Sequence, residues 1–156
     1  MAETEYLIST EPAWLDLDLI HRFLSEHSYW ARGIPRDLVA RSTANSLCFG
    51  VYAAGNRTPN PDRHQVGFAR VTTDRATFAY LADVFILPEH RGRGLSKRLM
   101  AAVLAHPDLQ GLRRWMLATA DAHELYREFG FTELSQPEVF MQRHDPDVYK
   151  STVGNN

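Results

Sequence analysis

Apolar residues recur at intervals of three and four positions near the start of the chain, over residues 13–27. This spacing is typical of an amphipathic helix, which has one apolar face and polar residues elsewhere. The residues of that face are Leu15, Leu19, Ile20, Phe23 and Leu24. A second, shorter helix is predicted from Pro35 to Arg41, because proline is well accommodated in the first turn of a helix.

After the second helix the pattern becomes that of β-strands. Strands are predicted over residues 46–52, 66–73 and 77–87, where β-branched and aromatic residues are frequent. The segment 54–64 contains glycine, asparagine and proline and is predicted to be a loop. Asp74 and Arg75 turn the chain between the second strand and the third. Because the connections are short, we expect the three strands to be antiparallel.

A break follows at residues 88–94, which contain proline and glycine and cannot continue a strand. Helical spacing resumes directly after the break and ends before Pro107. The apolar residues of this predicted helix are Leu95, Leu99, Ala102 and Val103. A short apolar strand is then predicted over residues 115–118.

The last predicted helix, over residues 122–129, has recognisable end signals. Asp121 and Glu124 have the spacing of a capping box, and Gly130 is a typical residue just past a helix end. Two final strands are expected over residues 131–134 and 139–143.

The predicted order is therefore ααβββαβαββ. The strand–helix–strand unit in the middle requires a parallel crossover, so the sheet should be mixed. The natural packing is an α/β fold with helices on both faces of the sheet. We expect one domain over residues 1–145, followed by a polar, frayed C-terminal tail over residues 146–156.

Composition narrows the class of protein without indicating its chemistry. The chain has 156 residues and a net charge of −2, which gives no basic field for nucleic acid or an anionic membrane. Its single cysteine, Cys48, can form no internal disulfide, and a zinc site needs several ligands, so no metal is expected. The N-terminus lacks a signal-peptide pattern and no apolar run is long enough to span a membrane, so a cytoplasmic location is expected.

The segment from Leu81 to Gly94 carries the strongest chemical signal. A strand ends, a turn with Gly92 and Gly94 follows, and a helix begins at once. Backbone N–H groups at such a turn, together with the partial positive charge of a helix N-terminus, can bind an anion. Four cations lie within eight residues, as a pyrophosphate site would need: Arg91, Arg93, Lys97 and Arg98. A Walker loop and a dinucleotide fingerprint are both absent. The alternative is a tight structural turn with a solvated basic face.

Two motifs resemble those of the GCN5-related N-acetyltransferase (GNAT) family. The run Arg91-Gly92-Arg93-Gly94-Leu95-Ser96 resembles the acetyl-CoA signature Gln/Arg-x-x-Gly-x-Gly/Ala, with Ser96 departing from the last position. The run Leu125-Tyr126-Arg127-Glu128-Phe129-Gly130-Phe131 resembles the family's Leu-Tyr-x-x-x-Gly-Phe, although Thr119 replaces the usual Asn upstream. The resemblance covers roughly residues 46–143 and extends to the predicted order of elements.

The resemblance implies a GNAT-like acyl-CoA N-acyltransferase fold and acetyl-CoA as cosubstrate. The implied cofactor-binding residues are Val84, Phe85, Ile86, Arg91, Gly92, Arg93, Gly94, Leu95, Ser96 and Lys97. The pantetheine arm would lie beside the end of the strand 77–87, and a backbone N–H near Val84 would face the thioester carbonyl. Such a donor stabilises the developing oxyanion.

The same resemblance implies that Tyr126 protonates the leaving thiolate, whereas a helical tyrosine outside the motif would be read as a core residue. Asp83 is the first candidate for the general base, because a carboxylate inside an apolar strand calls for a reason. A buried ion pair is an equally good reason. Strand alternation places Tyr80 on the face opposite to Asp83 unless a bulge intervenes, which makes Tyr80 a competitor.

The acceptor pocket is predicted from the family's use of the N-terminal helices and the last strands. Its candidates are Tyr29, Trp30, Arg32 and Tyr80, with Glu138 and Phe140 nearby in the last strands. Equally, Tyr29 and Trp30 could cover the end of the first helix. The function expected is acetyl transfer to the primary amine of a small molecule by direct attack. The alternatives are a protein N-terminal or lysine acetyltransferase and a non-catalytic acyl-CoA-binding module. A homodimer is expected by analogy alone.

Overall fold

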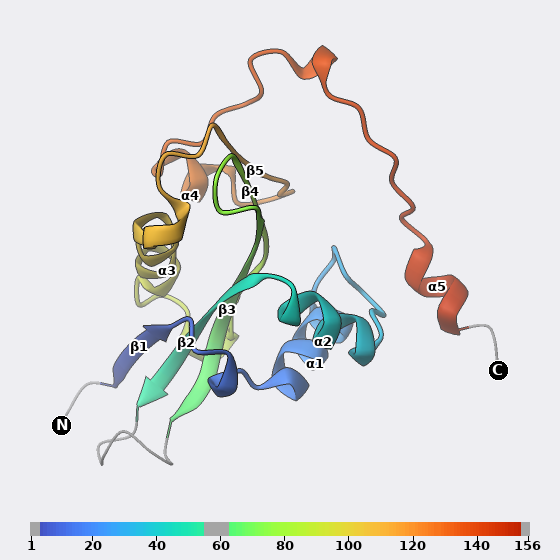
Figure 1. Ribbon diagram of the computed structural model, residues 1–156. Helices are drawn as coiled ribbons and strands as arrows, with labels where there is room; N and C mark the ends of the chain where they lie inside the picture. Colours follow the sequence, from blue (N-terminus) through green and yellow to red (C-terminus); the bar gives the residue numbers. More distant parts are fainter. Residues whose placement is uncertain (1–3, 55–62, 154–156) are drawn as a thin grey trace. The chain divides into compact units, whose positions relative to one another are not determined.

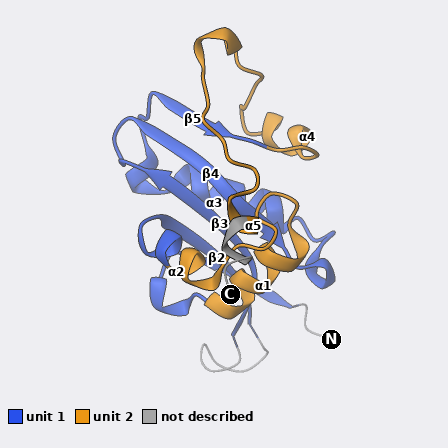
Figure 2. Ribbon diagram, turned by 90° about the vertical axis from the view of Figure 1, so that its right-hand side faces the viewer, with its two compact units in different colours: residues 1–16, 41–118 blue, residues 17–40, 119–156 orange. Residues whose placement is uncertain are grey.

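The computed structural model describes residues 4–54 and 63–153. The chain forms two compact units (Figure 2). The sheet unit contains residues 1–16 and 41–118, and the helical unit contains residues 17–40 and 119–156. The expected single domain over residues 1–145 stays a prediction.

The sheet unit is built on a five-stranded sheet in the order β1-β2-β3-β4-β5 (Figure 1). The strands are β1 (Glu5–Ser9), β2 (Leu47–Ala54), β3 (His64–Thr73), β4 (Phe78–Ile86) and β5 (Arg114–Leu117). Neighbours from β1 to β4 are antiparallel, and β5 is parallel to β4. The predicted mixed α/β sheet and its parallel crossover are confirmed.

The crossover between β4 and β5 is helix α3 (Leu95–Ala105), which contacts β2 and β4. One face of α3 is buried through Leu95, Leu99, Met100 and Val103, at the spacing expected of a helix on a sheet. The central strands bury Val51, Val66, Phe68, Val71 and Ala79 completely or nearly so. Each large apolar side chain removed from water contributes about 1.5–3 kcal/mol, so this core holds α3 against β2 and β4.

A tight turn joins β3 to β4 and is held by one side chain. The Asp74 carboxylate accepts hydrogen bonds from Ala76 N at 2.9 Å, from Thr77 N at 2.7 Å and from Thr77 Oγ1 at 2.5 Å. These donors hold the pKa of Asp74 well below its ordinary value. An Asp in this role explains why two strands can be joined within a few residues.

The helical unit contains α1 (Leu17–His27), the first part of α2 (Arg36–Ala44), α4 (His123–Arg127) and α5 (Val148–Val153). Helix α1 buries Ile20, Phe23 and Leu24, as its pattern predicted. After α1, the Ser28 hydroxyl donates to Leu24 O at 2.6 Å and accepts from Ala31 N at 3.0 Å. These bonds fix the course of the chain as it leaves the helix.

The first helix begins later than predicted. Residues Pro12–Trp14 form a separate 3₁₀ turn, η1, and Leu15 has extended backbone angles. The α-helix starts at Leu17, because the extended residue cannot join the two helical segments. Strand β1 was not predicted; it is an edge strand in which no residue is fully buried.

The two predicted final strands, over residues 131–134 and 139–143, are wrong. Of the described strands, β5 pairs with β4 alone, and residues 128–153 enter no ladder. Pro137–Val139 forms a 3₁₀ turn, η4, in place of the start of the second strand. A strand without a partner leaves its backbone unpaired, so alternation by itself does not make one. The polar tail, predicted to fray, contains helix α5.

The predicted capping box at α4 is also wrong. Ala122 is the N-cap residue and no side chain caps it in the described structure. Instead, Thr119 Oγ1 accepts hydrogen bonds from Asp121 N at 3.4 Å and from Ala122 N at 3.1 Å. The helix ends at Arg127, two residues before the predicted end, and Glu128 is its C-cap. Gly130 has a φ of +91° and its N–H donates to Arg127 O, so it closes the turn that follows the helix.

Candidate active site

Strand β4 is irregular near its C-terminal end. Phe68 pairs with Phe85, and Arg70 pairs with Ala82, so Asp83 and Val84 together face Ala69. Asp83 has a φ of +57°, in the left-handed region that is uncommon for residues other than glycine. This is a β-bulge, and it breaks the alternation of the strand beyond Leu81. The bulge that the sequence left open is therefore present.

The Asp83 side chain is held by Arg70 on the neighbouring strand. Arg70 Nε donates to Asp83 Oδ2 at 2.8 Å, and the two side chains are 20% and 9% exposed. Arg70 Nη1 lies 3.2 Å from both Ser46 Oγ and Thr72 Oγ1. The ion pair is one of the two roles that the sequence left open for Asp83.

The turn after β4 begins with the 3₁₀ segment η2 (Pro88–His90). Leu87 N donates to Val66 O at 2.8 Å, and Arg91 Nε donates to Ile86 O at 2.9 Å, so both ends of the turn are tied to the sheet. Gly92 has a φ of +76°, and no heavy atom lies within 4 Å of the position that a Cβ would occupy. The backbone is therefore open to an approaching group on this side.

Helix α3 starts at the end of this turn. Its N-cap residue, Gly94, has a φ of +75° and offers no side chain to the first N–H groups of the helix. The space beside Gly94 is as open as that beside Gly92. Uncapped N–H groups next to open space can bind an anion.

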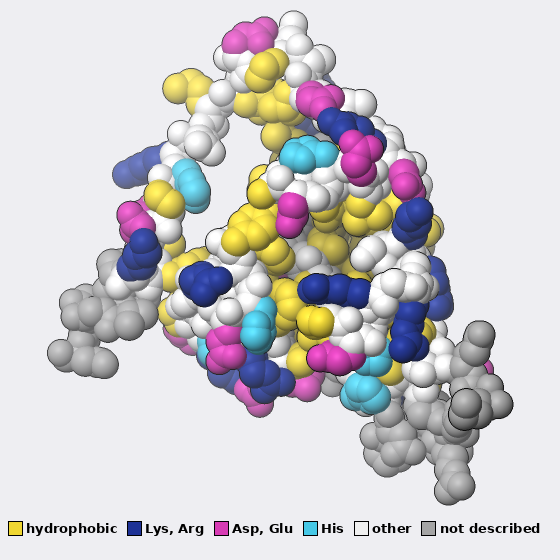
Figure 3. Space-filling model, turned by 180° about the vertical axis from the view of Figure 1, so that it is seen from behind, with side chains coloured by type: hydrophobic (Ala, Val, Ile, Leu, Met, Phe, Trp, Pro, Cys, Tyr) yellow, Lys and Arg dark blue, Asp and Glu magenta, His cyan; other side chains and the backbone are white. Residues whose placement is uncertain are grey.

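The four cations of this segment are exposed, but they do not all face solvent freely. Arg91 is bound to Ile86 O, and Arg98 Nη2 donates to Tyr6 O at 3.1 Å. The Arg93 guanidinium lies 6.0 Å from the centre of the Tyr6 ring. Figure 3 shows one face of the molecule, on which Lys and Arg side chains lie beside acidic ones rather than in one basic field.

Tyr126 belongs to the helical unit and lies on α4. It is 8% exposed, and its ring packs edge-on against Phe131 with centroids 6.0 Å apart. Burial, followed by the charges of Tyr29 and Asp121, raises the pKa of Tyr126 to about 12. The hydroxyl therefore keeps its proton at neutral pH, as a general acid must.

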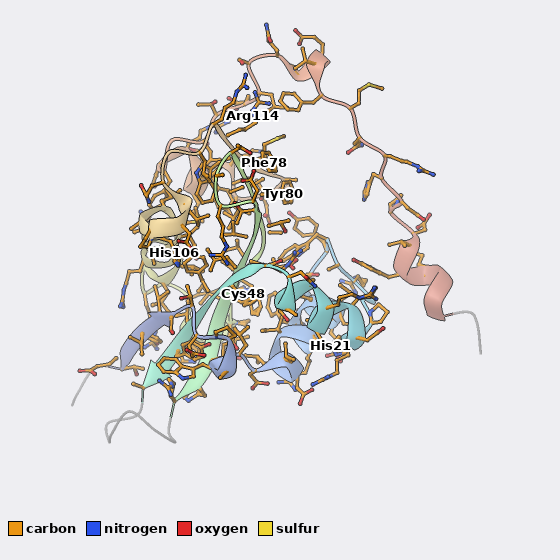
Figure 4. All side chains as sticks on the ribbon, in the orientation of Figure 1. His21, Cys48, Phe78, Tyr80, His106 and Arg114 are labelled. Atoms are coloured by element: carbon orange, nitrogen blue, oxygen red, sulfur yellow. The ribbon has the colours of Figure 1, made fainter. Side chains whose placement is uncertain are left out.

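The aromatic candidates for the acceptor pocket adjoin the segment that leads into α4. Tyr29 and Trp30 are 53% and 42% exposed and contact each other edge-on at 5.1 Å. The Tyr29 hydroxyl accepts a hydrogen bond from Ala120 N at 2.8 Å. Arg32 is exposed in the same unit. Tyr80 is 37% exposed. It lies on β4 of the sheet unit, as Figure 4 shows.

Arg70 is the residue of this region that sequence reasoning missed. The signal was an arginine within an otherwise apolar strand, between Ala69 and Val71. Such a residue needs a buried partner, and Asp83 supplies it. Pairing the two from the sequence would have required the register of the bulge.

The described residues hold no cluster of metal ligands, and the Cys48 thiol is protonated at neutral pH. Across residues 4–54 and 63–153, no group of three His, Cys, Asp or Glu side chains could hold a metal ion. Burial raises the pKa of the Cys48 thiol to about 12, so it is not a thiolate at neutral pH. Within the same ranges, no helix is long and apolar enough to cross a membrane.

More than half of the chain matches a known protein family. The family model described as an acetyltransferase (GNAT) domain matches residues 47–133. The chain belongs to the GNAT acetyltransferase family. It is therefore an acetyltransferase, and the match contains β2 to β5, the bulge, the glycine turn and α4.

Individual relatives agree with the family. A protein of Gibberella zeae named as an inferred acetyltransferase is 38% identical over 136 residues, which is 78% of this chain and 76% of the relative. A crystal structure of an inferred GNAT acetyltransferase from Xanthomonas campestris pv. campestris is 54% identical, with a TM-score of 0.86, over 93% of this chain and 96% of that one.

A more distant structural neighbour contains the cofactor. Aminoglycoside N-acetyltransferase AAC(6')-Iy in complex with CoA has a TM-score of 0.61 and 19% identity, over 92% of this chain and 97% of that one. At this identity the likeness concerns the fold alone. CoA is thus bound by a neighbour that shares the fold.

Proposed function

We propose that the chain transfers an acetyl group from acetyl-CoA to the primary amine of a small molecule, by direct attack within a ternary complex. The observation that carries this proposal is the end of β4, where a bulge, two glycines with positive φ and the uncapped start of α3 follow one another. This is the arrangement that the family's acetyl-CoA signature predicts.

In this proposal the pyrophosphate of CoA binds to the turn. The N–H groups of residues 92–96 supply donors, and the helix N-terminus adds partial positive charge. Ser96 keeps its backbone N–H, so its departure from the family pattern removes no donor. Arg93 and Lys97 add positive charge at the surface, whereas Arg91 is engaged with Ile86 O and supports the turn.

The pantetheine arm would then lie along β4 at Val84, Phe85 and Ile86. A backbone N–H near Val84 would donate to the thioester oxygen as it becomes negative. One such donor lowers the barrier by roughly 3 kcal/mol. The acceptor amine attacks the carbonyl carbon, the C–N bond forms, the C–S bond breaks, and the sulfur leaves as a thiolate that needs a proton.

Tyr126 supplies that proton in the proposed reaction. Its pKa of about 12 keeps it protonated across the neutral range. A thiolate is a weaker base than the tyrosinate, so the transfer is completed only as the tyrosine takes up the proton that the attacking amine loses. The proton lost by the attacking amine restores the tyrosine, directly or through water. The reaction is then balanced without a metal or a second cofactor.

The acceptor side is proposed from Tyr29, Trp30, Arg32 and Tyr80. The exposed edge-on aromatic pair offers a surface for a small amine, and Tyr29 is bound to the segment that precedes α4. Cytoplasmic location and a homodimer remain predictions.

The test is a calorimetric titration with acetyl-CoA and with CoA, followed by a thiol-release assay against small amines, lysine peptides and peptide N-termini. Micromolar binding and turnover of a small amine are expected. Binding with turnover of peptides alone would mean that the acceptor is the amine of a protein. Binding without any turnover would favour an acyl-CoA-binding module, and no binding would make the turn a structural corner.

A further inference from the structure

Asp83 adopts a backbone conformation that its neighbours must hold. Its φ of +57° lies within a strand, where residues are otherwise extended. Aspartate and asparagine tolerate this region better than most residues, but they do not require it. The bulge also gives Asp83 and Val84 a single opposite residue, Ala69, so the regular ladder does not fix them.

Arg70 restrains Asp83 from the neighbouring strand. Its guanidinium binds Asp83 Oδ2 at 2.8 Å and lies 3.2 Å from both Ser46 Oγ and Thr72 Oγ1. Ser46 immediately precedes β2, Thr72 is on β3, and Asp83 is on β4. One side chain therefore connects the bulge to two neighbouring segments of the sheet.

The geometry also argues against Asp83 as the general base. A general base must present a carboxylate oxygen to the amine that it deprotonates. The Asp83 side chain is only 9% exposed, and its Oδ2 already accepts from Arg70. The residue is placed to hold the strand rather than to exchange protons with a substrate.

We propose that the Arg70–Asp83 ion pair is a positioning device, which holds the β4 bulge so that the Val84 N–H is aimed at the thioester oxygen, and that Asp83 is not the general base. This inference rests on the proposed acetyl transfer. Loss of the pair should turn the Val84 peptide and lower kcat, because a small misplacement of a catalytic donor costs about a hundredfold in rate.

The test compares Arg70→Met, Asp83→Asn and Asp83→Gly in steady-state kinetics across pH. Asparagine tolerates positive φ and can still accept from Arg70, so Asp83→Asn should keep kcat within about tenfold of the wild type. Arg70→Met and Asp83→Gly should each lower kcat by roughly a hundredfold with KM for acetyl-CoA little changed. Glycine permits the backbone angle but cannot bind the arginine.

The pH profile separates positioning from base catalysis. A positioning residue leaves the acid limb of kcat unchanged in all three variants. If Asp83→Asn abolishes that limb and is as slow as Asp83→Gly while Arg70→Met stays active, Asp83 is the base and the proposal is overturned. Combining Arg70→Met with Asp83→Gly, which each remove the ion pair, should cost less than the sum of the two single effects, and strict additivity would also overturn the proposal.

Two further variants separate loss of the ion pair from a general loss of folding. Asp108→Asn removes the exposed Arg75–Asp108 ion pair of the same unit, and it should leave kcat unchanged. Arg70→Lys keeps the charge if Arg70→Met proves unstable, and it should still slow the reaction, because lysine cannot reproduce the guanidinium contacts.

Amide hydrogen exchange of residues 82–85 without ligand reports on the bulge independently of turnover. It should be faster by roughly tenfold in Arg70→Met than in Asp108→Asn. If the wild type neither binds acetyl-CoA nor acetylates an amine, the proposed function fails, whereas the exchange result still decides whether the ion pair holds the bulge. Unchanged exchange would overturn this inference even in an active enzyme.

Discussion

At Tyr126, burial is the largest cause of a raised pKa, which keeps the hydroxyl protonated but also makes it a weaker acid. Desolvation penalises the phenolate and raises the pKa to about 12, so the neutral donor form prevails wherever the enzyme operates. Because the folded chain holds this proton more tightly than the unfolded chain, the group contributes to the free energy of unfolding. That contribution is fully present below the ordinary pKa of 10.0 and is lost as the pH rises through about 12. A proton donor of this kind should not lose activity through its own ionisation between pH 7 and 9.

Tyr126→Phe should therefore lower kcat by about a hundredfold and leave the dissociation constant of acetyl-CoA unchanged, because the variant removes a proton donor and no CoA contact. Stopped assays of thiol release at several pH values would measure this. Tyr52→Phe is the matched control, since the Tyr52 hydroxyl is also buried with a raised pKa and has no hydrogen-bond partner in the described structure. Equal turnover of Tyr126→Phe and the wild type would remove Tyr126 as the acid.

A positive φ can be predicted from the residue type at some positions and not at others. Gly92 and Gly94 were predicted to give a ligand close access to the backbone, and both have a positive φ beside open space. Asp83 has a similar backbone angle with no glycine to signal it. Its conformation depends on the register between β3 and β4 and on Arg70, which lies thirteen positions away in the chain. That partner becomes visible only when the strands are paired.

At the scale of elements, the segments with local signals were predicted well. Helix α3 is defined by its own apolar spacing and by the proline that ends it, and the strands β2 to β4 by their composition and short turns. The strands expected over 131–134 and 139–143 failed because a strand also needs a neighbour, which its own residues do not specify. The edge strand β1 was missed for the converse reason, since only its pairing with β2 defines it.

The start of α3 is the element on which cofactor binding depends. Gly94→Asp should weaken acetyl-CoA binding by at least about tenfold, because it places a side chain and a negative charge where the pyrophosphate would lie. Calorimetric titration measures the effect. Gly111→Asp is the control, because Gly111 has a φ of +70° and equally open surroundings but lies away from the turn. If both variants bind acetyl-CoA as the wild type does, the pyrophosphate is held elsewhere.

At the scale of the whole molecule, the proposed functions are divided between the two units. The glycine turn and the bulge belong to the sheet unit, whereas Tyr126 and the aromatic pair belong to the helical unit. The proposed reaction therefore uses residues of both units. The prediction of one domain over residues 1–145 is thus tied to the proposed reaction, and thermal unfolding can examine both.

Acetyl-CoA should raise the melting temperature of the whole chain in a single transition. A ligand present at a hundred times its Kd stabilises the folded state by about 2.7 kcal/mol, and each kcal/mol shifts the Tm of a chain of this size by roughly 2–4 °C. If the units unfold as one, calorimetry will show one peak that moves entirely with ligand. Two peaks, of which one alone moves, would mean that the sheet unit binds acetyl-CoA without engaging the helical unit. Tyr126 would then lie outside the liganded cooperative unit, and its role as the acid would lose its structural basis.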